Sequence, residues 1–434
     1  MIRKGIVPFS FLCLCSALLS CQSGEADKTR EITLSNSSSV DLTDKAIAIS
    51  RDKLPDVPEG DVFPVLLTQS GDTVAAQLDD LDGDKAWDEL FFVTDLPAKG
   101  GQTLQLSWAT TKPAYTTRTS VRFGKRASAD TPVQPVTSDT SYANQLPKSA
   151  GFGYQPYQTD GPAWENDKVG FRHYLDGRNA KDVFGKKVSD MTPEAVGLDT
   201  AGAVEDNYHE MKEWGRDIMA VGSSAGIGGI GLMIGDSLYR LGVTVNDTVN
   251  NVESTNFNII TEGPVRSMMQ LRYNNWHPDG TNRTYTLEEQ PTIWPGMYAY
   301  RNTAKISGLQ GDETLLIGMN NLDRTDSIAE IDVDNKWVVL LTHDRETYRN
   351  EWLLGLALIL PKDAYQGYME APATGKLAQA YFAKMKAAEN QPVTYYAVAG
   401  WELSNEAFKD AASFRKYVQD LARQVTAEVE VKVN

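Results

Sequence analysis

VRSMMQLRY, residues 265–273, belongs to a series of apolar and β-branched runs that continues through RTYTLE (283–288), YAYRNTAKI (298–306), TLLIGM (314–319), WVVLL (337–341) and LGLALIL (354–360). Turn residues separate these runs, and no helical pattern comes between them. Strands in such close succession indicate antiparallel sheets packed face to face rather than alternating strands and helices. The sequence therefore predicts a mainly β fold, with a large antiparallel β-sandwich over residues 151–434.

A smaller β domain is expected over residues 31–108, where short apolar runs alternate with turns of Gly, Asp and Pro. Residues 109–150 are rich in Thr, Ser, Ala and Pro and are expected to form a linker or surface excursion. Near the end of the chain, apolar residues recur every three or four positions over 377–388 and again over 414–425. This spacing predicts two C-terminal helices whose apolar stripes face the core.

The first thirty residues have the pattern of an export signal. Arg3 and Lys4 precede an apolar run, and Cys21 follows directly after Leu-Leu-Ser. The pattern predicts a signal peptide over residues 1–20, lipidation at Cys21 and a polar tether over 21–30. An ordinary signal peptide with an incidental cysteine is the alternative. We therefore expect a membrane-anchored lipoprotein, held by its lipid in the periplasm or at the cell surface.

The chain has 434 residues and a formal net charge of −16. Binding to nucleic acid requires a basic field, so the sequence argues against a nucleic-acid partner. An anionic substrate is compatible with this charge only where arginines are concentrated locally. Such a concentration occurs in residues 164–187.

Residues 164–187, WENDKVGFRHYLDGRNAKDVFGKK, and residues 208–217, YHEMKEWGRD, hold two of the four histidines together with several arginines and carboxylates. Elimination next to the carboxylate of a uronic acid needs a base, an acid for the leaving oxygen and a group that neutralises the carboxylate. Arg172, His173 and Tyr174 supply these three types in succession. On a strand, Arg172 and Tyr174 share one face and His173 points to the other. The missing partner is therefore expected from residues 208–217 or from Trp276 and His277.

On this reasoning His209 or Tyr174 is the expected base or acid, with His173 and His277 as alternates. Arg172 and Arg178 are expected to neutralise the substrate carboxylate. The remaining expected substrate-binding residues are polar or suited to stacking on sugar rings: Trp214, Asp217, Trp276 and Trp294. Trp164 would also suit such stacking, and each tryptophan taken alone favours a place in the core over a sugar platform.

The loop DLDGDKAWDE, residues 80–89, sets carboxylates around a glycine, as calcium loops do. It predicts a structural Ca²⁺ site formed by Asp80, Asp82, Asp84 and Asp88, with a plain acidic turn as the alternative. The sequence requires no cofactor. A metal at the main site, with His209 as a ligand, stays open although no His-x-x-x-His or Cys-x-x-Cys pair occurs.

Two other functions, nucleotide binding and serine hydrolysis, lack the sequence motifs that define them. The glycine-rich run over residues 222–231 has no Lys-Ser/Thr of a phosphate loop and leads into an expected strand, which favours a close-packed strand crossing over a nucleotide site. No Gly-x-Ser-x-Gly motif supports a serine hydrolase. Glycoside hydrolysis by two carboxylates stays open, because the segment supplies several candidates.

Five long motifs carry a family resemblance: DLDGDKAWDELFFVTDLPA (80–98), GPAWENDKVGFRHYLDGRNAKDVFGKK (161–187), YHEMKEWGRDIMAVGSSAGIGGIGL (208–232), EGPVRSMMQLRYNNW (262–276) and YYAVAGWELSNEAFKD (395–410). They resemble lipoproteins of Gram-negative polysaccharide degraders that have long been grouped as a domain of unknown function. The resemblance covers nearly all of the chain after the signal peptide. It implies a β-sandwich of the lyase or mutarotase kind and places the lipoprotein in the periplasm or outer membrane.

The resemblance also implies a dehydratase that removes water from the non-reducing-end uronic acid of ulvan-type oligosaccharides and leaves a 4,5-unsaturated sugar. An anionic oligosaccharide is then the expected substrate. The alternatives are a glycan-binding lipoprotein without catalysis and a glycoside hydrolase that acts on the same oligosaccharides.

Overall fold

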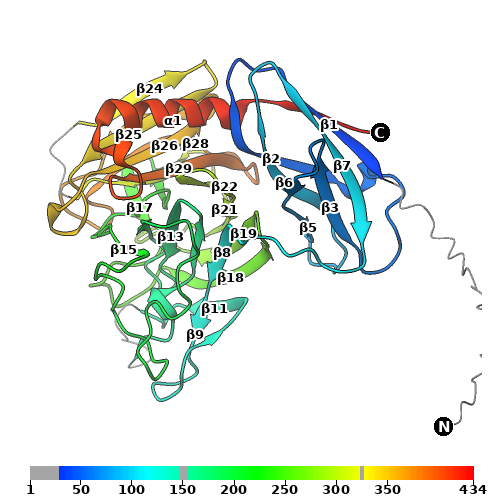
Figure 1. Ribbon diagram of the computed structural model, residues 1–434. Helices are drawn as coiled ribbons and strands as arrows, with labels where there is room; N and C mark the ends of the chain where they lie inside the picture. Colours follow the sequence, from blue (N-terminus) through cyan, green and yellow to red (C-terminus); the bar gives the residue numbers. More distant parts are fainter. Residues whose placement is uncertain (1–28, 147–153, 323–326) are drawn as a thin grey trace, which may run out of the picture.

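The computed structural model describes residues 29–146, 154–322 and 327–434. The expected signal peptide and Cys21 lie outside these ranges, as do most of the tether and the end of the expected linker. Figure 1 shows a smaller N-terminal β domain beside a larger β body, with one helix, α1 (Ala411–Thr426), lying along the larger body. The prediction of a mainly β, antiparallel fold is confirmed.

The N-terminal domain is built from two antiparallel sheets around its own apolar core. The five-stranded sheet has the order β30 (Val429–Val433), β1 (Arg30–Asn36), β7 (Gly101–Ala109), β3 (Phe63–Thr68), β4 (Thr73–Val74). The three-stranded sheet has the order β2 (Leu42–Ser50), β6 (Glu89–Leu96), β5 (Ala76–Asp79), and the short 3-10 helix η1 (Arg51–Lys53) follows β2. Because β30 pairs with β1, the end of the chain returns to this domain (Figure 1).

The larger body is organised on one long antiparallel sheet of ten strands. Nine of its strands follow the order β11 (Ser138–Tyr142), β18 (Val252–Glu262), β19 (Ser267–Trp276), β20 (Tyr285–Glu289), β22 (Ala299–Ser307), β29 (Val393–Trp401), β26 (Leu354–Pro361), β25 (Trp337–Asp344), β24 (Ala329–Val333). The tenth strand, β21 (Thr292–Ile293), pairs with both β19 and β22. The expected strands at 265–273, 283–288, 298–306, 337–341 and 354–360 lie in it.

Two five-stranded sheets share one continuous core with the long sheet. The first, which carries the candidate site, has the order β15 (Gly215–Asp217), β14 (Lys181–Lys186), β13 (Val169–His173), β12 (Ala163–Asn166), β8 (Thr119–Arg122). The second has the order β17 (Ser237–Arg240), β16 (Ile230–Ile234), β23 (Glu313–Asn320), β28 (Ala380–Lys386), β27 (Tyr365–Glu370). A two-stranded ribbon, β9 (Gly124–Lys125) with β10 (Gln134–Pro135), and the 3-10 helices η3 (Gln158–Asp160), η4 (Tyr348–Asn350) and η5 (Glu406–Lys409) complete the body.

The expected linker over residues 109–150 contributes strands to the larger body. β8 forms an edge of the site-bearing sheet, and β11 pairs with β18 in the long sheet. The short polar strands have few apolar residues of their own because their neighbours supply most of the core. This segment is therefore built into the sandwich over the part that the structure describes.

Of the two expected C-terminal helices, only the second exists. Helix α1 begins at Ala411, after an N-cap at Asp410 whose carboxylate accepts the backbone N–H of Ser413, and it buries Phe414, Val418 and Leu421. The prediction of a helix over 377–388 is wrong: strand β28 occupies most of it. β28 is buried on both faces, so its apolar residues do not alternate, and their spacing resembles a helical stripe. Within the described residues, no helix is both long and apolar enough to cross a bilayer.

Candidate active site

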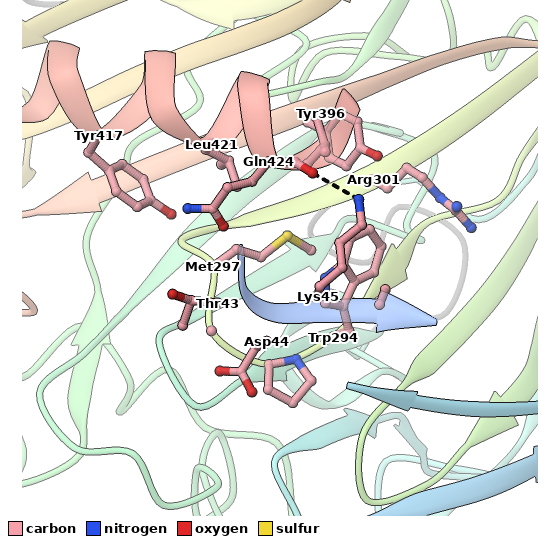
Figure 2. A pocket seen from close by; sticks show the side chains of 14 residues that line it. Thr43, Asp44, Lys45, Trp294, Met297, Arg301, Tyr396, Tyr417, Leu421 and Gln424 are labelled. Atoms are coloured by element: carbon pink, nitrogen blue, oxygen red, sulfur yellow. Dashed lines mark hydrogen bonds between the residues drawn. The ribbon is translucent and has the colours of Figure 1, made fainter. Parts of the chain in front are cut away.

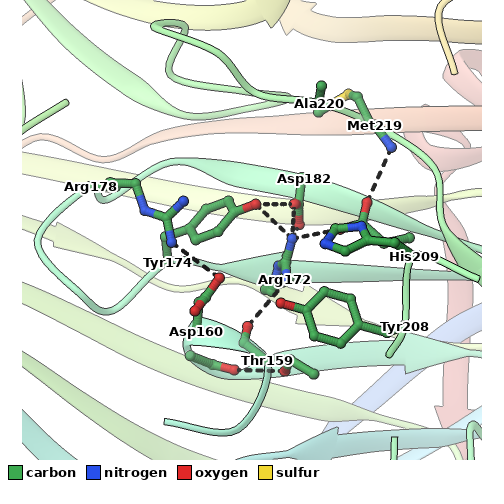
Figure 3. Close-up of polar contacts among 12 residues, drawn as sticks. Thr159, Asp160, Arg172, Tyr174, Arg178, Asp182, Tyr208, His209, Met219 and Ala220 are labelled. Atoms are coloured by element: carbon green, nitrogen blue, oxygen red, sulfur yellow. Dashed lines mark hydrogen bonds and ion pairs between the residues drawn. The ribbon is translucent and has the colours of Figure 1, made fainter. Parts of the chain in front are cut away.

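Arg172 joins three neighbouring strands of the site-bearing sheet. It lies on β13, directly opposite Asp182 on β14, and Asp217 ends the next strand, β15. Arg172 Nε donates to Asp182 Oδ1 at 3.0 Å, and Nη2 donates to Asp217 Oδ2 at 2.8 Å and also contacts Asp182 Oδ2. The three side chains are almost completely buried. Residues 164–187 and 208–217 therefore meet in one polar cluster (Figure 3).

Tyr174 extends this cluster on the same face as Arg172. Its hydroxyl accepts a hydrogen bond from Arg172 Nη2 at 2.6 Å and donates one to Asp182 Oδ2 at 2.7 Å. The Arg178 guanidinium lies 3.7 Å from the centre of the Tyr174 ring and forms ion pairs with Asp176 and Asp160. Strand alternation thus places Arg172 and Tyr174 together, as the sequence predicts.

A cavity of about 450 Å³ opens over this cluster. Its wall is largely polar and aromatic and consists of Gln155, Asp160, Arg172, Tyr174, Arg178, Val204, Asp206, Tyr208, His209 and Tyr348. Both segments singled out by the sequence contribute to it. The cavity is large enough for a sugar residue, and its polar groups converge on one space.

His209 is the histidine of this wall, and 41% of its side chain is exposed. Its ring lies between Tyr208 and Tyr348, with ring centres 4.6 and 5.3 Å away, and its Nδ1 lies 3.5 Å from Asp217 Oδ2. Burial, and then the positive charge of Arg172, lower the pKa of His209 below its ordinary value of 6.5. The imidazole is therefore neutral at pH 7 and able to accept a proton.

Tyrosine hydroxyls face the cavity beside this base. Burial raises the pKa of Tyr174, Tyr208 and Tyr348, so each stays protonated at neutral pH. Tyr208 donates to Asp206 Oδ1 at 2.9 Å, and Tyr174 donates to Asp182. Among the described residues, the Tyr348 hydroxyl has no hydrogen-bond partner. Tyr348 is thus the phenol most available to a ligand.

Tyr348 was not singled out from the sequence. It begins η4 between β25 and β26, and Arg349 and Asn350 directly after it adopt left-handed conformations with φ of 63° and 54°. Its backbone N–H donates to the carbonyl of Ile218, at the end of β15. Left-handed conformations in non-glycine residues occur in tight turns and also cluster at functional sites. No local pattern in the sequence marks this turn.

The other expected site residues lie elsewhere. His173 is fully buried on the opposite face of β13, with its ring 6.1 Å from that of Tyr273. His277 is exposed, and its Nδ1 lies 3.0 Å from the Thr284 hydroxyl. Neither lines the cavity, so neither is brought together with His209.

The four expected sugar-stacking tryptophans also lie away from this cavity, and Trp164 is buried in the core of the larger body. Trp214 packs on Phe184 beneath the site, with 6% of its surface exposed. Trp276 is fully buried, and its Nε1 donates to the carbonyl of Arg240. Trp294 lines a different cavity, between the two domains. Stacking on sugar therefore falls to the tyrosines if it occurs at this site.

Both expected carboxylate-neutralising arginines are already paired with acids. Only 1% of the Arg172 side chain is exposed, against 20% for Arg178. Of the two, Arg178 alone has surface with which to touch a substrate, and it shares its charge with Asp176 and Asp160. The positive charge that the sequence concentrates at Arg172 and Arg178 is thus balanced by neighbouring acids.

The predicted calcium loop lies between β5 and β6 of the N-terminal domain. Ligand atoms of Asp80, Asp82 and Asp88 lie within 4.8 Å of one another, whereas Asp84 is outside this group and accepts the N–H of Ala86. Among the described residues this is the one cluster of three or more potential ligands at such spacing, so the candidate cavity holds none. Calcium binding at the loop stays a prediction.

A model of the family "Domain of unknown function (DUF4861)" matches residues 34–431. An uncharacterized protein, P7, of Formosa agariphila is 26% identical over 299 residues, which cover 64% of this chain and 69% of that protein.

Among solved structures, an alpha-mannosidase from Enterococcus faecalis V583 and a protein in glycosyl hydrolase family 38 from Enterococcus faecalis each give a TM-score of 0.48 at 10% identity. The likeness covers 94% of this chain, and the chain spans about half the length of either structure, 46% and 48%. At so low a TM-score the likeness carries no argument about activity.

Proposed function

Since the chain belongs to the DUF4861 family, whose description names no activity, we propose its function from the cavity itself: a carbohydrate-active enzyme that eliminates water from the non-reducing-end uronic acid of an oligosaccharide. The observation that carries the proposal is a neutral base, His209, beside a neutral acid, Tyr348, on the wall of one sugar-sized cavity. The family resemblance carried by the five motifs implies ulvan-type oligosaccharides, which are therefore the candidate substrates.

The proposed step needs no external reactant. His209 takes the proton from C5 of the uronic acid, the C–H electron pair becomes the C4–C5 double bond, and the C4–O bond breaks. The leaving oxygen takes a proton from the Tyr348 hydroxyl and departs as water. The proton on His209 then returns to the tyrosinate, which restores both groups. Tyr174 and Tyr208 line the same cavity and hold hydroxyl groups of the sugar.

Two charged residues support this chemistry. Burial raises the pKa of the Asp217 carboxyl, and above that pKa its Oδ2, 3.5 Å from His209 Nδ1, stabilises the imidazolium that forms when the base is protonated. Arg178, the more exposed arginine of the wall, lies where it can interact with the uronate carboxylate as negative charge develops at C5.

Glycoside hydrolysis is the second candidate, and one observation favours it. Arg172 and Arg178 are paired with acids, and Asp160 and Asp206 also line the cavity, so its surroundings are acidic. Such surroundings suit a neutral sugar better than a uronate and supply carboxylates for acid and base roles. A glycan-binding protein without catalysis is the third candidate.

A single assay separates the three. The full chain is incubated with saturated, uronate-terminated oligosaccharides, and the products are followed by ultraviolet absorbance and mass spectrometry. Elimination gives the absorbance of a conjugated double bond and an intact oligosaccharide lighter by one water. Hydrolysis splits the oligosaccharide, and pure binding changes neither readout. A folded protein that produces no absorbance across a panel of uronates contradicts the proposal.

We also propose that the protein is a lipoprotein anchored through Cys21, in the periplasm or at the surface of a Gram-negative cell. The support is the sequence: Arg3 and Lys4 precede an apolar run, and Leu-Leu-Ser stands directly before Cys21. Cell fractionation tests it: a Cys21→Ser variant should leave the membrane fraction, and protein that stays membrane-bound after this change contradicts the anchor.

A further inference from the structure

A groove runs between the N-terminal domain and the larger body, beside the last turns of α1 (Figure 2). It consists of two adjoining cavities of about 350 Å³ each, which share Ala46, Trp294 and Arg301. We call their combined wall the interdomain groove. It shares no lining residue with the cavity that holds His209.

One cation of this groove, Arg301 on β22, has no ion-pair partner among the described residues. Among the residues that the structure describes, no carboxylate forms an ion pair with it, and its Nε is buried without a hydrogen-bond partner. The guanidinium lies 5.6 Å from the centre of the Trp294 ring, which holds it by a cation–π contact. Arg301 is thus positioned by its neighbours but not neutralised by them.

A second cation comes from the opposite domain. Lys45, on β2, donates from Nζ to the backbone carbonyl of Gln424 at 2.8 Å, as Figure 2 shows, and has no carboxylate partner among the described residues. Burial lowers the pKa of Lys45 to about 8. A lysine with no carboxylate partner is destabilised in this way when water is removed from around its charge.

The acids of the groove are already committed to other arginines. Both carboxylate oxygens of Asp44 accept from Arg118, at 2.7 and 2.8 Å, and Arg118 also pairs with Asp167. Glu89 pairs with Arg266 at 2.6 Å. These pairs tie the two domains together and leave Arg301 and Lys45 without an ion pair among the described residues. Glu89 attracts Arg301 at longer range, but the repulsion from Arg266 is the larger effect.

Uncompensated, partly buried cations are costly, and they are unexpected in a chain with a net charge of −16, where acids are abundant. An anionic ligand would supply the missing charge. Thr43 and Gln424 in one cavity, and Gln290 and Thr292 in the other, add side chains suited to hydroxyl groups. Each cavity has the volume of a single sugar unit rather than of a long chain.

We propose that the interdomain groove binds a sugar that carries a carboxylate or sulfate group, and that Arg301 and Lys45 hold this oxyanion between the two domains. The site is separate from the proposed catalytic cavity and would hold a second acidic unit of the same glycan or of another chain. The choice of an acidic sugar rests on the proposed function, whereas the anion site rests on the groove alone.

The test is calorimetric titration of the full chain with glucuronate, glucose 6-sulfate, inorganic sulfate and glucose at pH 7. Glucuronate and the sulfated sugar should bind more tightly than inorganic sulfate, and glucose should not bind. Arg301→Gln should weaken both acidic sugars at least tenfold, and Lys45→Gln severalfold. The matched control, Arg423→Gln, removes an arginine of α1 that pairs with Asp420 and should leave both affinities unchanged.

Other outcomes are equally informative. Acidic sugars that bind equally well to wild type and to Arg301→Gln overturn the site, and so does a wild type that binds none of the anions. Inorganic sulfate that binds as tightly as the sugars overturns the assignment to a glycan. Because Arg301 lies outside the cavity that holds His209, a chain that binds glucuronate through Arg301 but eliminates no water refutes the proposed function and not the groove.

The pH dependence supplies a second readout that survives a poorly folding variant. The other ionisable groups at the groove are the paired acids Asp44 and Glu89, the arginines Arg266 and Arg301, and Tyr396 and Tyr417, whose pKa values burial raises. Burial lowers the pKa of Lys45 to about 8, so this side chain loses its charge as pH rises through that value. Affinity for glucuronate should therefore fall as pH rises through about 8, and this fall should be absent in Lys45→Gln.

Discussion

Arg172 and Asp217 lie 45 residues apart in the chain and meet at 2.8 Å between β13 and β15, where both are buried. The same guanidinium nitrogen also contacts Asp182. One buried cation therefore serves two carboxylates, and a third group, Tyr174, hydrogen-bonds to both Arg172 and Asp182. Burial, and then the negative charge of Asp182, raise the pKa of Asp217 well above its ordinary value of 3.8.

This pKa makes stability depend on pH in a definite direction. A carboxyl group whose pKa is raised by folding contributes stability below its unfolded pKa, near 3.8, and loses it as pH rises toward the folded value. The Asp217→Asn variant has no carboxyl group at this position, so it does not lose this stability as pH rises. Between pH 4.5 and pH 7, the free energy of unfolding of this variant should therefore rise relative to that of wild type.

Urea unfolding at the two pH values measures this difference. Asp190→Asn, which removes an exposed acid, is the control and should show the wild-type dependence on pH. Parallel pH dependences of wild type and Asp217→Asn would show that Asp217 stays ionised in the folded protein.

A change at His209 should affect catalysis and not folding. Because burial and Arg172 lower its pKa below 6.5, the rate of water elimination should fall only below about pH 6.5 and be flat from there toward neutrality. His209→Gln should lower kcat by roughly 10²–10⁴-fold, which is typical for loss of a general base. The conjugated-alkene absorbance gives both results. His277→Gln, at an exposed histidine outside the cavity, should behave as wild type, and equal losses in the two variants would remove His209 from the mechanism.

Tyr348 should supply the proton for the leaving oxygen. Tyr348→Phe keeps the ring that packs at 5.3 Å from His209 and removes only the hydroxyl, which has no partner among the described residues. The expected result is a fall in kcat of at least about 10²-fold with little change in KM or in the free energy of unfolding. Tyr142→Phe, at a side chain that is 58% exposed, is the matched control. An unchanged kcat in Tyr348→Phe would transfer the acid role to Tyr174 or Tyr208.

The sequence predicts much of this arrangement, and the failures have physical causes. Strand alternation correctly separates Arg172 and Tyr174 from His173, because a two-residue period is a local property of the backbone. Tyr348 could not be found, since it reaches the cavity from a short turn whose position depends on the packing of β25 and β26. The ion pair between Asp160 and Arg178 and the return of β30 to β1 likewise depend on tertiary contacts, which a spacing pattern does not record.

Substitutions at the buried ion pair between Lys181 and Glu289 test how much this pair stabilises the core of the larger body. Both side chains are fully buried, Lys181 Nζ donates to both carboxylate oxygens at 2.8 Å, and the Tyr273 hydroxyl donates to Glu289 at 2.7 Å. Lys181→Met leaves a buried carboxylate without its cation and should lower the free energy of unfolding by about 3–5 kcal/mol. Adding Glu289→Gln should recover part of the loss, because the amide keeps hydrogen bonds and carries no charge.

Chemical denaturation of the single and double variants measures the coupling. Lys416→Met, which breaks an exposed pair with Asp420 on α1, is the matched control and should change stability by less than about 0.5 kcal/mol. If Lys181→Met were as mild as Lys416→Met, Glu289 would have to take up a proton in the variant, and its stability would then rise on acidification. A double variant less stable than Lys181→Met would instead show that the ionised Glu289 is stabilised by Tyr273 and Asn302 without the lysine.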